Sequence, residues 1–148
     1  MAWLKMLHIA TAVLWLGNFV ITGIWSIRAF TSGSAELRRF AAREILFTDL
    51  LFTFGVGAAV IMSGIGLAAL EGFNPWAVLW TRMALLTTIG SGVAWMLLLL
   101  PLEIRLTRLT KSEHVLAATQ TFIWWNIIGW LITIALFSVI YLMVARPM

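Results

Sequence analysis

Six polar or tryptophan side chains recur along the first apolar segment of the chain. They are His8, Thr11, Trp15, Asn18, Thr22 and Trp25. The steps between them are three or four residues, which places all six on one face of a helix. An unpaired polar group in hydrocarbon costs several kcal/mol, so we expect this stripe to face other protein rather than lipid.

His8 is the residue in this stripe with the widest chemistry. An imidazole in the interior of a helical bundle can ligate haem iron, relay a proton or hydrogen-bond to another helix. These three alternatives stay open, and we take His8 as the axial ligand of a b-type haem as the leading hypothesis. His114 lies at the start of the last apolar segment. The two ends of a membrane helix are roughly 30 Å apart, so both histidines of one chain cannot bind one iron.

Further residues are candidates for the same haem pocket. Met83 and Met143 lie at depths close to that of His8 and are possible second axial ligands, although most membrane methionines only pack. Arg82 is a candidate for a haem propionate, the alternatives being snorkelling to the interface or pairing with Glu71. Five tryptophans are deep enough to wall a porphyrin or to fill a core: Trp15, Trp95, Trp124, Trp125 and Trp130.

Three other polar residues fall within the apolar segments. Asn18 and Asn126 lie at similar depths, and we predict a polar seam in which buried amides lock helices together. On the last segment the seam continues through Thr119, Asn126 and Thr133. For Asp49 we expect an ion pair with Arg28 or Arg43 at the headgroup boundary, the alternative being a proton-relay carboxylate that lines a transport path with the amides.

Composition sets the fold class. The chain has 148 residues, of which 62% are hydrophobic and 11% charged, against about 25% charged in soluble domains. A bilayer span needs roughly 20 apolar residues, which predicts helices at 3–27, 46–70, 78–100 and 115–143. We therefore predict an all-α, integral membrane, four-helix up-and-down bundle as a single domain, 1–148. No cysteine is present, which excludes disulfides and thiolate sites.

The basic residues predict an orientation. The segments Arg28–Arg43 and Pro101–His114 are read as loops and hold seven of the ten basic residues, whereas Lys5, Arg82 and Arg146 lie at the opposite face. By the positive-inside rule, we expect both loops in the cytoplasm of a bacterium, with the chain in the inner membrane and both termini in the periplasm. The basic loops suit anionic lipid headgroups, and we expect a lipid bilayer and no nucleic acid as partner.

Local signals refine these elements. Residues Ala35–Arg43 are expected to form an amphipathic start to the second helix, and Pro75 is expected to open the third. Small residues on the two middle helices predict close helix packing: Gly55, Ala59, Gly66, Gly90 and Gly92.

Several motifs carry a resemblance to a known family. They are Trp3–His8 (Trp-Leu-Lys-Met-Leu-His), Val13–Asn18 (Val-Leu-Trp-Leu-Gly-Asn), Thr48–Thr53, Pro101–Leu106 and Tyr141–Pro147. Together they resemble a bacterial family of small predicted integral membrane proteins classed as a domain of unknown function. The resemblance covers nearly the whole chain and implies four helices and an inner-membrane location, without an established activity.

A more distant likeness concerns the first helix alone. The pattern from Lys5 to Gly17, Leu-His followed by Trp and Gly, is similar to HemJ-type protoporphyrinogen oxidases and CopD-type copper-resistance proteins. In the HemJ type, a histidine matching His8 is associated with b-type haem, and this role transfers to His8 only. Copper handling of the CopD type would need more histidine and methionine at the outer face.

The sequence therefore leaves three classes of function. The first is a haem-associated membrane protein with His8 as ligand. The second is a non-catalytic accessory or scaffold subunit that binds another membrane protein or a second copy of the chain. The third is a small transporter component. Whether the chain is an enzyme stays open.

Overall fold

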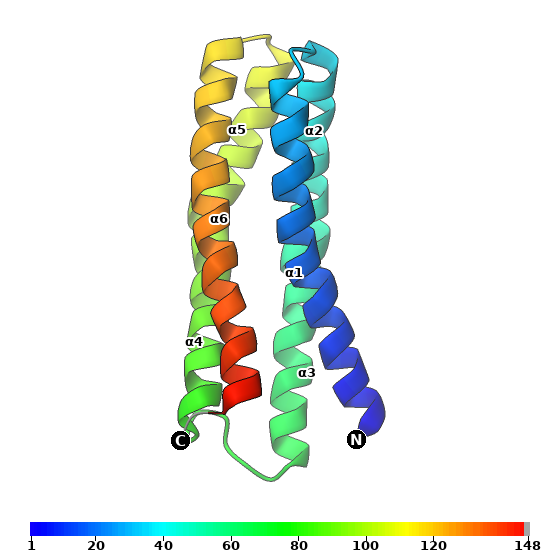
Figure 1. The fold of residues 1–148 in the computed structure, drawn as a ribbon, viewed down its shortest axis with the longest axis vertical. Coiled ribbons are helices and arrows are strands. Elements are labelled where there is room, and N and C mark those ends of the chain that lie inside the picture. The colour runs from blue at the N-terminus through cyan, green and yellow to red at the C-terminus, as the bar shows by residue number, and fades with distance from the viewer. Residues whose placement is uncertain (147–148) are drawn as a thin grey trace.

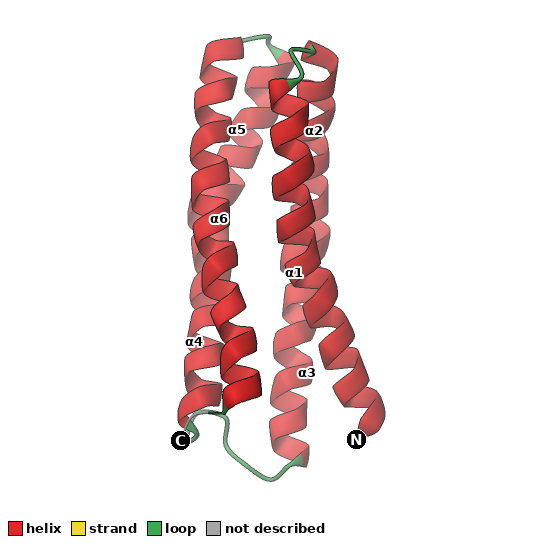
Figure 2. Ribbon diagram, viewed as in Figure 1, coloured by secondary structure: helices red, strands yellow, loops and turns green. Residues whose placement is uncertain are grey.

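The computed structural model describes residues 1–146 and contains no strand in that range (Figures 1 and 2). Pro147, the last residue of the C-terminal resemblance, lies outside the described residues. Two of the four helical rods are uniform, and two contain a π-helical segment. The elements are α1 (Ala2–Thr31); α2 (Ala35–Thr48), η1 (Asp49–Val56) and α3 (Gly57–Leu70); α4 (Leu79–Ala94), η2 (Trp95–Leu99) and α5 (Leu100–Lys111); and α6 (Val115–Ala145).

The predicted class, an all-α four-helix bundle, is confirmed. Each of the four rods is long and apolar enough to cross a membrane. Their outward faces carry large exposed apolar side chains such as Ile21, Phe54 and Leu131. Water would not favour such a surface, whereas lipid chains match it.

The rods run up and down, as the predicted topology requires. Both chain ends and the turn between α3 and α4 lie at one end of the bundle, which we call the termini end (Figure 1). The connections α1–α2 and α5–α6 lie at the other, the two-loop end. Helix α2 packs against α5, α4 against α6, and α1 against both α3 and α6, whereas α3 and α4 touch little.

The two middle rods extend well beyond the predicted 46–70 and 78–100, so most of the predicted loops 28–43 and 101–114 is helix. The predicted amphipathic start at Ala35 is present. The extensions are helical because they bury an apolar face against each other: Ala42 and Ile45 of α2 and Leu106 of α5 are fully buried. Thr107 Oγ1 also donates a hydrogen bond to the Ala42 carbonyl at 3.2 Å. Charge marked the edge of the apolar span here, and not the end of the helix.

The helix ends follow local rules with one exception. Ser34 caps α2, since its hydroxyl accepts from the Leu37 amide. Gly72, at φ +75°, ends α3: its amide bonds to the Ala69 carbonyl and that of Phe73 to Ala68, the pattern of a Schellman motif. The prediction that Pro75 opens a helix is wrong, because residues 75–77 form a turn and α4 begins at Leu79.

Of the glycines predicted to pack closely, Gly66 does so, since a Cβ there would lie 3.4 Å from Leu4 Cδ2 of α1. A Cβ at Gly55, Gly90 or Gly92 would meet nothing within 4 Å, so these three face open surroundings. At Gly57 a Cβ would lie 3.0 Å from Trp15 Nε1, and at Gly64 3.1 Å from the His8 ring. The glycines that matter are those that make room for an aromatic ring of the neighbouring helix.

Two glycines of the same rod test this difference. We expect Gly57→Leu to lower the free energy of unfolding by about 1–3 kcal/mol, because the new side chain overlaps the Trp15 ring. Gly55→Leu, two residues away, should be close to neutral. Thermal unfolding in detergent, followed by circular dichroism, measures both, and equal losses would contradict the packing described.

Candidate functional site

The polar stripe of α1 faces protein, as predicted. Trp15 and Thr22 are buried, and the other four members are half-buried. Ile21 and Val13, which lie off the stripe, are 64% and 65% exposed. The seam of α6 behaves similarly, since Thr133 is buried and Asn126 half-buried, although Thr119 at its start is exposed.

Asn18 and Asp49 form the central contact of the stripe. The Asn18 amide nitrogen donates to Asp49 Oδ1 at 3.0 Å, and Thr22 Oγ1 donates to Asn18 Oδ1 at 3.2 Å. The predicted ion pair of Asp49 with Arg28 or Arg43 is wrong. Asp49 is only 2% exposed, and the ion pairs found within residues 1–146 involve other groups. The physical reason is that Asp49 is turned into the bundle, while Arg28 and Arg43 are exposed at its surface.

Glu103 completes this contact and was missed in the sequence. It is fully buried, its side chain lies within hydrogen-bonding reach of Asp49, and its Oε1 accepts from Trp125 Nε1 at 3.1 Å. We call Asp49 and Glu103 the carboxyl pair. Glu103 was overlooked because it fell in a charged segment read as a loop. The available signal was its spacing from Leu99, Leu106 and Thr110, which puts it on one buried helix face.

Both members of the pair lie next to π-helical turns. Asp49 is the first residue of η1, and Glu103 follows η2 by one turn. A π-helical turn changes the direction in which the following side chains point, and such turns occur frequently at functional sites. Here the π-helical turns lie next to two acids that point into the bundle, beside the strongly charged extensions of the same rods.

Several buried hydrogen-bonding groups at or near the pair have no hydrogen-bond partner among residues 1–146. The Trp95 indole nitrogen lies within reach of both carboxyl groups but forms no well-aligned hydrogen bond with either. Glu103 Oε2 and Thr53 Oγ1, one turn beyond Asp49, are buried and also have no partner among residues 1–146. An unsatisfied buried polar group costs about 1–3 kcal/mol, which points to a role other than stability.

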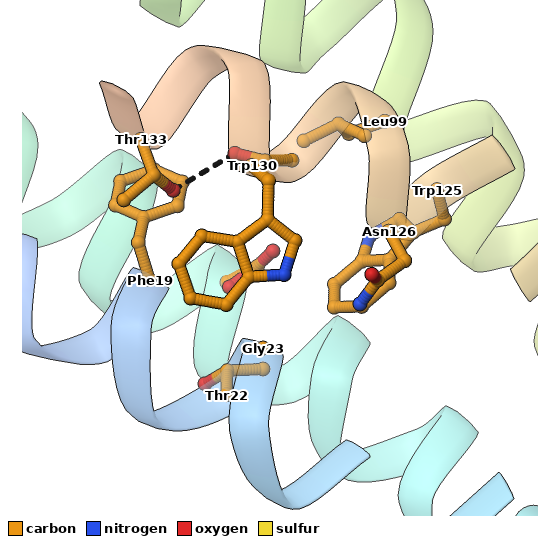
Figure 3. A pocket seen from close by; sticks show the side chains of 10 residues that line it. Phe19, Thr22, Gly23, Leu99, Trp125, Asn126, Trp130 and Thr133 are labelled. Atoms are coloured by element: carbon orange, nitrogen blue, oxygen red, sulfur yellow. Dashed lines mark hydrogen bonds between the residues drawn. The ribbon is translucent and has the colours of Figure 1, made fainter. Parts of the chain in front are cut away.

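A small cavity adjoins Asp49 between α1 and α6 (Figure 3). Its volume of about 20 Å³ is sufficient for one water molecule, which needs at least 10–15 Å³. Asp49, Thr22, Asn126 and Thr133 supply its polar lining, and Trp130 is among its apolar walls. Asn126 thus lines a cavity and does not bond to Asn18, so the predicted lock between helices comes from Asn18 and Asp49 instead.

His8 lies further along α1, against α3. Its Nδ1 is 3.1 Å from the Val60 carbonyl oxygen and 2.9 Å from Ser63 Oγ. With the proton on Nδ1, the ring donates to the Val60 carbonyl and Nε2 keeps its lone pair; with the proton on Nε2, Nδ1 accepts from the Ser63 hydroxyl. His8 therefore forms an interhelical hydrogen bond in either tautomer, and the first of the two suits a metal ligand.

The other predicted haem residues are not gathered around His8. Arg82 and Met83 are exposed on α4, Met143 is half-buried on α6, and none of them lines the cavity beside Asp49. His114 is exposed at the two-loop end, where its Nδ1 lies 2.9 Å from Ser112 Oγ. The two histidines are thus at opposite ends of the bundle, which agrees with the prediction that they cannot share an iron.

Charged groups at the termini end pair with each other. Lys5 Nζ contacts Glu71 Oε1 at 2.9 Å, so Glu71 does not pair with Arg82 as one alternative held. The hydrogen bond from Lys5, together with its charge, lowers the pKa of Glu71 below the ordinary value. This ion pair fixes the start of α1 to the turn after α3 and has no link to the carboxyl pair.

The tryptophans predicted to wall a cofactor have separate roles. Trp125 donates a hydrogen bond to Glu103, and Trp95 lies within reach of both carboxyl groups. Trp15 packs over Gly57, and Trp130 packs over Gly23. Trp124 is 61% exposed and lines an open groove between α5 and α6.

Fold and site together define a class: a four-span helical membrane bundle with a pair of acids and its tryptophan donor buried in the interior. A family model described as "Predicted integral membrane protein (DUF2269)" matches residues 2–147. The chain belongs to this family. No curated protein and no solved structure matches it.

Adjacent tryptophans provide a test of the site geometry. We expect Trp125→Phe to lower the free energy of unfolding by about 1–3 kcal/mol, because the Glu103 carboxyl loses the hydrogen bond that it accepts from α6. Trp124→Phe, exposed on the same helix, should change it by less than about 0.5 kcal/mol. Chemical unfolding in mixed micelles compares the two, and similar losses would argue against the bond to Glu103.

Proposed function

We propose that the protein is a proton-binding component of a small membrane transporter. Its proton site is the Asp49–Glu103 pair, which takes up and releases a proton inside the bundle. The observation that carries this proposal is that two buried carboxyl groups lie in contact with each other, with no cation within ion-pair distance among residues 1–146. Intramembrane acids of this kind are associated with proton relays.

Electrostatics favours a shared proton. The effective penalty for burying one unpaired charge is several kcal/mol, and two negative charges in contact add their repulsion. Within residues 1–146, neither carboxyl has a basic group within ion-pair distance. Two carboxyl groups at one site commonly hold one proton between them. Glu103 Oε2, which accepts no hydrogen bond, is a natural position for that proton.

The remaining contacts suit the singly protonated pair. Asn18 donates one hydrogen bond to Asp49, and Trp125 donates one to Glu103. Neither donor carries a charge. Neutral donors stabilise a single negative charge without forming a permanent ion pair. The pair therefore keeps one proton to give up and one position to accept another.

The first test of this function is spectroscopic. Wild-type protein in lipid nanodiscs at neutral pH should show the infrared C=O stretch of a protonated carboxyl group. Asp49→Asn and Glu103→Gln should each shift its frequency, because the remaining buried acid stays protonated without its partner, and the double variant should abolish it, because both acids are then amides. Both replacements keep the shape of the side chain.

Glu36→Gln is the matched control, since Glu36 is exposed at the start of α2. It should leave the signal unchanged. A wild-type protein without the signal at neutral pH would falsify the proton-binding function. Together with colourless protein, that result would favour the scaffold class, which needs neither proton nor haem.

Haem binding through His8 is a second candidate, favoured by one observation. With the proton on Nδ1, the hydrogen bond to Val60 fixes the ring and leaves Nε2 as a ligand atom, the arrangement commonly seen for metal-bound histidine. The fit is limited to one axial ligand, because Met83, Met143 and Arg82 are not assembled around it. A haem bound there would supply electron-transfer chemistry, and His8 would orient it through Ser63 and Val60.

An absorption spectrum decides this candidate. If haem b binds, protein expressed with ample haem shows a Soret band that His8→Ala abolishes and His114→Ala preserves, because only His8 lies inside the bundle. Colourless wild-type protein would exclude the haem and leave the carboxyl pair unaffected.

We further propose the orientation given by the basic residues: two-loop end in the cytoplasm, termini in the periplasm, in a bacterial inner membrane. Because the chain has no cysteine, single cysteines report on it without background. Cysteine at Ser34 or Ser112 should resist a membrane-impermeant thiol reagent in intact cells, whereas cysteine at Asn74, in the turn at the termini end, should react. The reverse pattern would invert the topology.

A further inference from the structure

The cavity beside Asp49 lies between α1 and α6 and is not fully enclosed, which bears on how a proton reaches the pair. The cavity lining comes mainly from these two helices: Thr22 and Gly23 from α1, and Asn126, Gly129 and Thr133 from α6. Glu103 does not line it. Asp49 is therefore the member of the pair that the cavity reaches.

The polar lining suits a single water molecule. A buried water commonly makes about three hydrogen bonds, and a cavity of about 20 Å³ holds roughly one. Asn126 lines the cavity and forms no hydrogen bond with residues 1–146, so its amide is available to bind water. The Thr22 hydroxyl donates to Asn18 and keeps lone pairs that accept from water. The carboxyl group of Asp49 is the third partner.

The Trp130 ring lies over the cavity. Its ring packs across Gly23, where a Cβ would come within 3.1 Å of the Trp130 Cζ2 atom. The glycine thus allows an indole to lie against the α1 backbone at the level of the cavity, as Figure 3 shows for Gly23, Thr22 and Trp130. Trp130 lines the cavity and is half-buried, so its side chain also reaches the surface of the bundle.

We propose that a water held in this cavity by Asn126, Thr22 and Asp49 carries protons to the pair, with Trp130 as its cover. In the uptake step, a hydronium ion that reaches the cavity gives one proton to the cavity water. That water gives one of its protons to an Asp49 carboxylate oxygen. The hydronium becomes water, the cavity water is regenerated, and the charge of the pair becomes less negative by one.

This inference rests on the proposed proton-binding function and adds the route and its cover. The route has a different measurable property from the site. Removing both members of the pair removes the protonated carboxyl group itself, whereas changing the route alters how fast that group exchanges its proton with solvent.

The experiment is hydrogen–deuterium exchange of the pair, followed by time-resolved infrared spectroscopy of nanodisc-embedded protein after transfer to D₂O. Asn126→Leu should slow exchange by about tenfold, the effect on a rate of about 1.4 kcal/mol, because the water loses a polar partner. Trp130→Ala should accelerate exchange, because the cover is removed. Gln120→Leu and Trp124→Ala, at exposed positions on the same helix, should leave the rate unchanged.

The outcomes separate the two proposals. An exchange rate that is unchanged in either Asn126→Leu or Trp130→Ala overturns the route, while the protonated carboxyl signal would still support the site. Absence of that signal in the wild type overturns the site itself. Circular dichroism of each variant establishes that the bundle is folded before exchange is compared.

Discussion

The interior of this protein is arranged around two acids that lie in contact inside an apolar bundle. An acid there is tolerated only when other groups replace the hydrogen bonds that water would give it. Asn18 reaches Asp49 from α1, Trp125 reaches Glu103 from α6, and Trp95 lies beside both. Four rods thereby meet at one point, so the polar contact also determines how the helices are arranged.

The use of tryptophan follows from the same constraint. An arginine or lysine opposite the pair would neutralise it and form a fixed ion pair. An indole N–H gives a directed hydrogen bond without charge, and its ring fills apolar volume. Within residues 1–146, Trp15 and Trp130 form no hydrogen bond with the acids, and they fit because Gly57 and Gly23 leave room for them. Aromatic rings against Gly57 and Gly23 take the place of the contacts expected at Gly55, Gly90 and Gly92 from sequence spacing alone.

The fold was predictable because the apolar composition and the helical periodicity extend over the whole length of each span. Four apolar runs predict four helices, and the spacing of His8, Trp15, Asn18 and Thr22 predicts the face of α1 that is buried. The site was only half predictable. Asp49 stood out in an apolar run, but Glu103 sat among Arg105, Arg108 and Lys111, where an acid is ordinarily a surface residue. Its partner lies on another rod, and a pattern along one helix does not contain that information.

The uneven contact between the helices has a mechanical consequence. At the two-loop end, α2 and α5 are tightly packed and Phe30 stacks on Phe122 with ring centroids 4.0 Å apart. Towards the termini end, α3 and α4 touch little, and the bundle resolves into the pairs α1/α3 and α4/α6. The helices are therefore joined at the two-loop end and divided into two pairs at the termini end. Asp49 lies on the rod that continues into α3, and Glu103 lies on the rod that continues from α4. A small change in the distance between the two helix pairs would therefore change the distance between the two acids.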